Sequence, residues 1–268
     1  MRKEILIYFV LSAFCSIFAR IMISKNKIKY IRSLELKKNR NKEGKFVAEG
    51  HKVVDDLLVL QPADLIVATG EWLKGKHFPA QTEVIEVTEE ELKKVSFLQH
   101  PQQVLAVFKQ ATSGDYSINT NELNLALDGV QDPGNLGTII RIADWYGIKT
   151  IICSETTADA YNPKVVQASM GSIARVRMIY TPLQPLLSSL PQHYPVYGTL
   201  LHGENIYTTQ LTKHGIIVMG NEGNGIGKET QQHITRSLTI PRFNADEGPE
   251  SLNVAIATAI VCSEFRRL

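Results

Sequence analysis

The first half of the chain alternates short apolar runs with amphipathic stretches, which predicts strands and helices in turn. Between residues 24 and 45, Ile28, Ile31 and Leu34 follow a helical stripe while lysines occupy the other positions, so a basic helix and a turn are expected. Thr88 and Glu91 have the spacing of a capping box, which opens a further helix. The expected strands cover residues 46–50, 64–68, 83–87 and 104–108, and the other expected helices 51–60 and 71–74. This alternation predicts a small α/β domain.

The second half has a different pattern, because its strands are nearly continuous apolar runs. Residues 123–127 form such a run, which is typical of a strand buried on both faces of a parallel sheet. Further strands are expected at 150–153, 176–180, 196–200, 216–219 and 238–240, and helices at 136–146, 163–170, 183–190, after Gly227 and at 251–267. The pattern predicts a mainly parallel α/β domain.

A polar segment rich in small residues separates the two patterns and predicts a linker at residues 111–121. The smaller α/β domain is then expected at residues 22–110 and the mainly parallel domain at 122–268.

The first 21 residues resemble a signal peptide, because an uncharged stretch at 5–19 follows Met-Arg-Lys. The stretch is shorter than the ~20 apolar residues that a membrane span needs. Met22 precedes Ile-Ser-Lys-Asn-Lys, a natural cytoplasmic start, so we expect translation to begin there and residues 1–21 to be a non-native extension. A genuine signal or membrane anchor, or an amphipathic extension, is the alternative. Unless residues 1–21 are an anchor, no membrane association is expected.

Charge is nearly balanced overall but concentrated in one segment. The chain has 268 residues with a formal net charge of +2, 44% apolar and 21% charged residues, which excludes collagen, a coiled coil and wholesale disorder. Residues 24–52 nevertheless hold ten Lys/Arg against three acidic residues. This segment is either a solvated helix face or a surface that binds a polyanion.

The cysteines indicate a reducing compartment and no metal. Cys15, Cys153 and Cys262 are odd in number and far apart, so they form neither a disulfide framework nor a CxxC site. No His/Cys/Asp cluster has metal-ligand spacing either. A cytoplasmic protein without a metal site is expected.

Common phosphate-binding and nucleophile motifs do not fit the glycine-rich segment 220–228. A P-loop needs a glycine where this chain has Glu222, and Ser or Thr where it has Glu229. A carboxylate there would repel phosphates. The Rossmann GxGxxG and the GxSxG elbow are also absent.

Two segments place polar residues after predicted strands in a way that suggests a site. In residues 132–141, a loop turns into a helix that Asn135 can cap, with Arg141 in the second turn. An ordinary capped helix with a surface arginine would look the same. In residues 216–223, a strand runs into a glycine turn, which either is simply tight or lets a ligand approach the backbone.

A third such segment, residues 240–255, runs from Ile-Pro through a loop into the last helix. Ser251 could cap that helix, whereas Asn253 lies inside it and is a weak helix former. All three segments follow strands, and open α/β sheets bind ligands at the carboxyl ends of their strands.

The ordered strings NLGTIIR, IVMGNEG and IP…SLNVAIATAI resemble the SpoU (TrmH-type) RNA 2′-O-methyltransferases of the SPOUT class over residues 121–268. Residues 25–108, with KFVAEGHKVV, resemble the small substrate-binding domain that precedes many SpoU domains, which is similar to RNA-binding ribosomal proteins. The resemblance implies an α/β fold with a deep C-terminal trefoil knot, S-adenosylmethionine as cofactor, RNA as substrate and a homodimer.

The resemblance also implies roles for particular residues. The catalytic positions are Asn135, Arg141, Glu222, Ser251 and Asn253, and the cofactor-binding positions are Leu200, Gly220, Ile240 and Leu252. The basic segment then becomes the candidate RNA surface, through Lys25, Lys27, Lys29, Arg32, Lys37, Lys38 and Arg40. The loop 242–250 departs from the usual pattern, because it is longer and has no Gly soon after the proline.

The expected reaction is methyl transfer from a sulfonium to a ribose 2′-oxygen of rRNA or tRNA. Arg141 is expected to hold the 2′-oxygen and a phosphate rather than to remove a proton, because an arginine side chain stays protonated in proteins and a neutral guanidine is costly. Two alternatives stay open: a non-catalytic RNA-binding protein of this fold, and a SPOUT enzyme that methylates a base.

Overall fold

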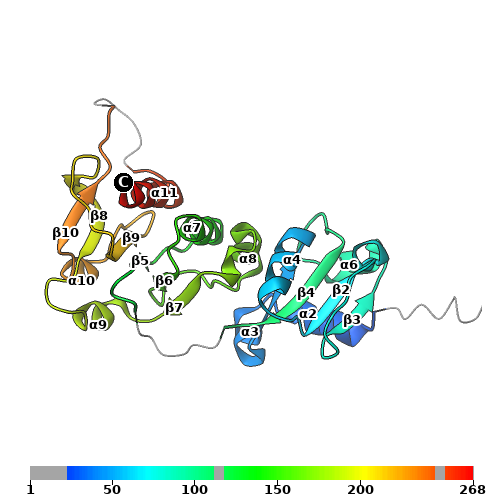
Figure 1. The fold of residues 1–268 in the computed structure, drawn as a ribbon. Coiled ribbons are helices and arrows are strands. Elements are labelled where there is room, and N and C mark those ends of the chain that lie inside the picture. Colours follow the sequence, from blue (N-terminus) through cyan, green and yellow to red (C-terminus); the bar gives the residue numbers. More distant parts are fainter. Residues whose placement is uncertain (1–22, 112–117, 245–250, 268) are drawn as a thin grey trace, which may run out of the picture.

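Two β-sheets organise the chain, one in each half (Figure 1). The computed structural model describes residues 23–111, 118–244 and 251–267. The extension expected at residues 1–21 lies outside the described residues, as do parts of the expected linker 111–121 and of the loop 242–250.

The N-terminal sheet has four strands in the order β1-β4-β2-β3. β1 and β2 run antiparallel to β4, and β3 runs parallel to β2. The strands are β1 (Lys45–Glu49), β2 (Leu65–Ala68), β3 (Glu83–Glu86) and β4 (Val104–Lys109). The helices are α2 (Lys25–Ser33), α3 (Lys37–Glu43), α4 (His51–Leu60), α5 (Gly70–Leu73) and α6 (Glu89–Val95). The predicted capping box is confirmed at the start of α6.

Both faces of this sheet are covered, because alternate residues of a strand point to opposite sides. Val104, Ala106 and Phe108 of β4 enter a core that also contains the buried side of α4. Leu105 and Val107 enter a second core with residues of α2 and α6. β4 is therefore apolar at successive positions rather than at every second one.

A break divides the expected basic helix into α2 and α3. Leu34 follows α2 and is fully buried, and Leu36 precedes α3. The carbonyl oxygens of Leu34 and Glu35 accept hydrogen bonds from the guanidinium of Arg40 at 2.9 and 2.6 Å. In a continuous helix those carbonyls would bond to amides four residues on. The buried arginine thus accounts for the break, which the lysine-rich pattern did not reveal.

The C-terminal sheet has six strands in the order β10-β8-β9-β5-β6-β7, and all its neighbours pair in parallel. The expected α/β fold with a parallel sheet is confirmed. Its strands are β5 (Leu123–Asp128), β6 (Thr150–Cys153), β7 (Arg177–Tyr180), β8 (Val196–Asn205), β9 (Gly215–Gly220) and β10 (Arg236–Thr239). Its helices are α7 (Pro133–Trp145), α8 (Pro163–Ser169), the short η1 (Ser172–Ala174), α9 (Leu183–Ser188), α10 (Lys228–Gln231) and α11 (Val254–Arg266).

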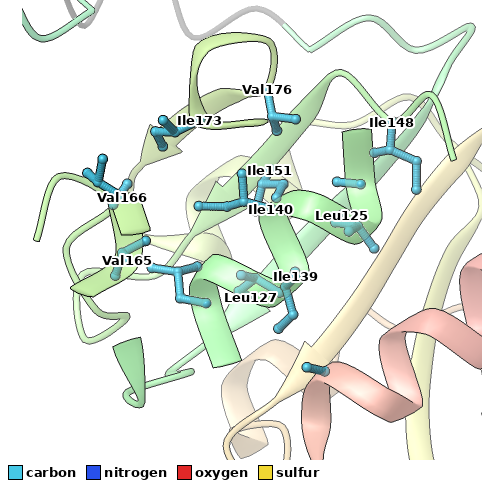
Figure 2. Close-up of a cluster of buried hydrophobic side chains, with 14 of the residues drawn as sticks. Leu125, Leu127, Ile139, Ile140, Ile148, Ile151, Val165, Val166, Ile173 and Val176 are labelled. Atoms are coloured by element: carbon cyan, nitrogen blue, oxygen red, sulfur yellow. The ribbon is translucent and has the colours of Figure 1, made fainter. Parts of the chain in front are cut away.

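Helix α7 is held on this sheet by a dense apolar cluster (Figure 2). Its Ile139 and Ile140 are fully buried, and they share the cluster with Leu125 of β5 and Ile151 of β6. α7 also contacts α8 closely at Gly137, where an added Cβ would lie 2.5 Å from the Cβ of Ala168. This packing fixes the start of α7 against the sheet.

The N-terminal and C-terminal sheets share one of their hydrophobic cores. Residues of β1 and β4 belong to the same buried cluster as residues of β5 and α7. At the junction, the rings of Phe46 and Tyr161 lie with centroids 4.8 Å apart. Helix α8 contacts β1 there, next to the N-terminal domain in Figure 1.

The two longest helices within the described residues, α7 and α11, have 13 residues each. Across the ranges that the structure describes, no helix is long and apolar enough to span a membrane.

Candidate active site

The start of α7 is set by Asp132, not by Asn135. Asp132 is the N-cap residue, and its Oδ1 accepts a hydrogen bond from the backbone N of Asn135 at 2.7 Å. The expectation that Asn135 caps the helix is therefore wrong, because its backbone amide is itself the capped group. The side-chain amide of Asn135 is left available for other contacts.

The turn after β9 positions Glu222. Asn221 pairs with Gly225 in an isolated bridge, and its Oδ1 accepts from the amides of Gly223 and Asn224 at 2.9 and 3.0 Å. Its Nδ2 donates to the carbonyl of Gly129 at 2.7 Å, which ties the turn to the end of β5. This bonding holds the exposed Glu222 at the carboxyl edge of the sheet.

Helix α11 begins at Asn253, which is its N-cap residue. Its Oδ1 accepts from the amides of Ala255 and Ile256 at 3.0 and 3.2 Å. The expectation that Ser251 caps the helix is wrong, since Ser251 precedes the helix as an exposed residue. The presence of a weak helix former at position 253 is explained, because asparagine is a favoured N-cap.

Three of the predicted site residues form one hydrogen-bonded chain. Asn253 donates from Nδ2 to Oδ1 of Asn135 at 2.9 Å, and Asn135 donates from its own Nδ2 to Oε1 of Glu222 at 2.8 Å. The starts of α11 and α7 and the turn after β9 thereby meet at one point. The last group in this hydrogen-bonded series is the carboxylate of Glu222, which can accept further hydrogen bonds.

Arg141 does not belong to the hydrogen-bonded series of Asn253, Asn135 and Glu222. It is exposed in the third turn of α7, one turn later than expected, and its side chain forms no hydrogen bond or ion pair with the residues that the structure describes. Six positions after Asn135 on a helix correspond to about 9 Å along the axis and about 120° around it. The structure thus leaves the guanidinium of Arg141 open to a ligand rather than to Glu222.

Three of the four predicted cofactor residues lie in or directly after adjacent strands of the C-terminal sheet. Gly220 ends β9 and is half-buried, and Ile240 follows β10 directly. Leu200 lies in β8, between these two in the sheet. Leu252, directly before Asn253, is 49% exposed. Gly220 and Leu252 therefore lie within two positions of Glu222 and Asn253 along the sequence, whereas Leu200 and Ile240 belong to the neighbouring strands β8 and β10 or directly follow them.

β8 departs from the expected strand 196–200 because it continues to Asn205 with a break in register. Gly198 pairs with Ser237, but the next pair joins Glu204 to Leu238. Residues 199–203 are therefore looped out of the ladder, and Leu200 belongs to this bulge. Bulges re-aim side chains next to functional sites and carry no periodic sequence signal.

The seven basic RNA candidates have different environments. Lys27 pairs with Glu83 at 2.7 Å, and Arg32 donates to the carbonyl of Ser96 at 2.5 Å. The exposed candidates whose side chains form no hydrogen bond or ion pair within the described residues are Lys25, Lys29, Lys37 and Lys38. These four remain available to a polyanion.

Arg40 is the one candidate that the structure contradicts. It is 1% exposed and forms an ion pair with Asp159 of the C-terminal domain at 2.5 Å. A guanidinium enclosed in this way cannot contact RNA without leaving its partners. A charge count along the sequence could not separate this buried arginine from its exposed neighbours.

Neither described cysteine is a nucleophile at neutral pH. Burial raises the pKa of Cys262 to about 12, and it raises the pKa of the fully buried Cys153 as well. Both thiols are free and buried. Among the described residues, no group of three His, Cys, Asp or Glu side chains is placed to hold a metal ion.

Two residues of the site escaped the sequence reasoning. Asp132 precedes Pro133, and an N-cap aspartate followed by proline at the first helical position is a recognised start signal. Asn221 forms an Asx-type turn, for which asparagine before Gly-rich sequence is typical. The first signal was readable, whereas the contact of Asn221 with Gly129 depends on tertiary structure.

Comparisons with known proteins match both halves of the chain. Residues 122–263 match the SpoU rRNA Methylase family, and residues 25–106 match the MRM3-like substrate binding domain. The 23S rRNA (guanosine(2553)-2′-O)-methyltransferase RlmP of Bacillus subtilis is 30% identical over 252 residues, which are 92% of this chain and 99% of that protein.

The fold is also similar to solved structures of RNA methyltransferases. A TrmH-family protein from Porphyromonas gingivalis has a TM-score of 0.84 at 42% identity, with 91% of this chain and 98% of that chain covered. The AdoMet-bound rRNA methyltransferase from Sinorhizobium meliloti has a TM-score of 0.80 at 32% identity, with 91% and 95% covered. The chain belongs to the SpoU rRNA methylase family.

Proposed function

We propose that the protein transfers a methyl group from S-adenosylmethionine to a ribose 2′-hydroxyl of ribosomal RNA. The observation that carries the proposal is the hydrogen-bonded chain from Asn253 through Asn135 to Glu222, formed where strand-end loops of the C-terminal domain meet. The similar RlmP of B. subtilis is named for 2′-O-methylation of 23S rRNA, which favours rRNA over tRNA as the substrate class.

The residues present fit a bound S-adenosylmethionine. Leu200 lies in β8, Gly220 ends the neighbouring β9 and Ile240 follows the neighbouring β10, while the partly exposed Leu252 adds apolar surface next to Asn253. Apolar walls with strand-end backbone groups suit an adenosine and a methionine tail. When bound, the cofactor supplies a methyl group on a positively charged sulfur.

The hydrogen-bonded chain orients the polar groups that face the ribose. Asn253 and Asn135 hold Glu222 by its Oε1, so its second oxygen can accept from the ribose or from a positioning group. A carboxylate fixed before substrate binds needs no reorganisation during the reaction. Ser251, exposed two positions before Asn253, contacts the RNA in this proposal.

Arg141 binds the phosphate beside the target ribose in this proposal. Its exposed guanidinium has no partner among the described residues, and a guanidinium fork matches phosphate geometry. Holding the 2′-oxygen and the phosphate as charge develops requires no neutral guanidine.

The RNA is proposed to lie across the exposed lysines of α2 and α3. Lys25, Lys29, Lys37 and Lys38 supply non-specific phosphate contacts, while the ribose chemistry occurs at the C-terminal sheet. The 2′-hydroxyl is present at every nucleotide, so choice of the target depends on these additional contacts. In this arrangement residues 22–110 form the RNA-binding domain, 111–121 the linker and 122–268 the catalytic domain.

Finer features of the fold and assembly complete the proposal. We infer a deep trefoil knot around the last helix, a ribosomal-protein-like N-terminal domain, a homodimer and a cytoplasmic location. The exposed Trp145 and Ile256 support the homodimer, since they lie on α7 and α11, which pack side by side. The two free buried thiols suit a reducing compartment.

The test is methyl transfer by the purified chain from isotope-labelled S-adenosylmethionine to an unmodified 23S rRNA transcript. Nuclease digestion and nucleoside mass spectrometry should yield a 2′-O-methylated nucleoside. A methylated base would indicate a base methyltransferase. If the chain bound RNA but neither bound the cofactor nor transferred a methyl group, it would be a non-catalytic protein. Either result would refute the proposed function.

A further inference from the structure

Arg40 is a buried charge that bridges the two domains. Its Nε and Nη2 donate to Oδ2 of Asp159 at 3.2 and 2.5 Å, and its Nη1 donates to the carbonyls of Leu34 and Glu35. α3 of the N-terminal domain carries the arginine, whereas Asp159 lies in the loop between β6 and α8. The guanidinium therefore fixes α3 against a single loop of the C-terminal domain.

The loop that carries Asp159 supports the segment leading to the active site. Ala158 donates from its backbone N to the carbonyl of Val130 at 2.9 Å, and Ser154 Oγ accepts from the backbone N of Gly129 at 2.9 Å. The same Gly129 accepts through its carbonyl from Asn221, the residue before Glu222. Segment 129–130 is thus bonded on one side to the Asp159 loop and on the other to the turn of Glu222.

The apolar part of the junction does not by itself define an orientation. The Phe46–Tyr161 contact and the shared core are non-directional, because apolar burial depends on area. A charge-assisted hydrogen-bond fork has directions fixed by its planar geometry. A buried ion pair is weak evidence for stability, and its better attested use is to specify one arrangement.

We propose that Arg40 is a positioning residue, which holds the RNA-binding domain in one orientation against the loop that supports the active site. The inference rests on the proposed function. RNA bound on the exposed lysines of α2 and α3 is then presented to Asn135 and Glu222 at a fixed offset. Loss of the fork misplaces the target ribose without removing any RNA contact, and small misplacements slow a reaction strongly.

The kinetic test uses the double variant Arg40→Met/Asp159→Met, since replacing both partners by apolar groups avoids an unpaired buried charge. With an unmodified 23S rRNA transcript, the maximal transfer rate should fall about tenfold or more. The double variant should bind RNA and S-adenosylmethionine with affinities within about twofold of those of the unmodified chain. The salt dependence of its RNA binding should be unchanged. Unchanged turnover in the folded double variant would overturn the proposal.

Lys38→Met is the matched control on the same helix. Its exposed ammonium is expected to touch phosphate, so RNA affinity should fall, and the slope of log affinity against log salt should become shallower by about 0.7 to 0.9 for the one lost contact. If the Arg40→Met/Asp159→Met chain instead shows this reduced slope, the substitutions act on RNA contacts rather than on the placement of the ribose, and the positioning role is wrong.

A second measurement does not depend on activity. Spin labels on Lys93→Cys and Lys213→Cys, in a Cys15→Ser background diluted with unlabelled chain, report the distance between domains by pulsed electron resonance. The distance distribution should be narrow with Arg40 and broad in the double variant. Equal widths would refute the positioning role. A chain that transfers no methyl group would refute the proposed function, and the distances would still decide the role of Arg40.

Discussion

The side-chain amide of Asn253 donates to Oδ1 of Asn135 at 2.9 Å, across 118 positions of the sequence. This bond gives the amide of Asn135 one orientation, with its oxygen toward Asn253 and its nitrogen toward Glu222. The reverse orientation would oppose two donors at one end and two acceptors at the other. The carboxylate of Glu222 is therefore placed by the first turn of α7 and the N-cap of α11 together.

Asn135→Asp should break the hydrogen bond between position 135 and Glu222. The new carboxylate cannot donate to Glu222 and adds a like charge at hydrogen-bond distance. We expect the transfer rate to fall about 100-fold, which is typical for loss of an orienting donor in a polar site. Single-turnover transfer to the 23S rRNA transcript measures the effect. Asn224→Asp, in the exposed turn of Glu222, is the control and should transfer at nearly the normal rate. Normal transfer by Asn135→Asp would mean that the chain of amides has no catalytic role.

Arg141→Ala should abolish methyl transfer and leave cofactor affinity within about twofold, because the guanidinium is proposed to contact only RNA. Arg141→Lys keeps the charge but loses the fork, so it should recover only part of the rate. Calorimetry with S-adenosylmethionine and a transfer assay with RNA separate the two effects. Near-normal turnover in the alanine variant would remove Arg141 from the mechanism.

The parts of the site that follow strand ends could be predicted from the sequence. Glu222 and Asn135 each follow an apolar run, and carboxyl ends of parallel strands lie at one edge of a sheet. The capping box of Thr88 and Glu91 was equally readable, because it involves residues three positions apart.

The burial of individual side chains and the pairing register of the strands could not be predicted from the sequence in the same way. Arg40 stands in a run of exposed basic residues, and only its partner Asp159, 119 positions later, distinguishes it. The looped-out residues of β8 depend on how β10 pairs with it. The sequence pattern predicts Asn253 inside a helix rather than at its start, since element boundaries depend on which side chain satisfies the free amides.

Trp145→Glu should weaken the proposed homodimer. Trp145 is 84% exposed at the end of α7, and a large exposed aromatic side chain is typical of an interface. A carboxylate in its place would be desolvated on association without a partner. Light scattering after gel filtration should show a shift toward monomer. Val59→Glu alters a residue of the N-terminal domain that is 83% exposed and should leave the mass unchanged. A dimer that tolerates Trp145→Glu would place the interface elsewhere.

Glu49 should make stability depend on pH. Burial raises the pKa of its carboxyl above the ordinary value, although Ser96 and the backbone amide of Phe97 donate to it at 2.5 and 2.7 Å and oppose the shift. The folded chain therefore keeps this proton to higher pH than the unfolded chain does. Where the folded state binds more protons, the free energy of unfolding falls as pH rises.

The loss should begin near the unfolded pKa of about 4.3 and end above the raised folded pKa. The side chain in Glu49→Gln cannot ionise. The urea concentration at the unfolding midpoint should therefore decline less steeply with pH for this variant than for the unmodified chain, over the range from roughly pH 4 to pH 7. Glu43→Gln, at the exposed end of α3, is the control and should keep the original slope. Since the glutamine has one acceptor oxygen for two donors, its absolute stability should be lower at acid pH. Parallel pH profiles for Glu49→Gln and the unmodified chain would show that the carboxyl of Glu49 does not titrate differently on folding.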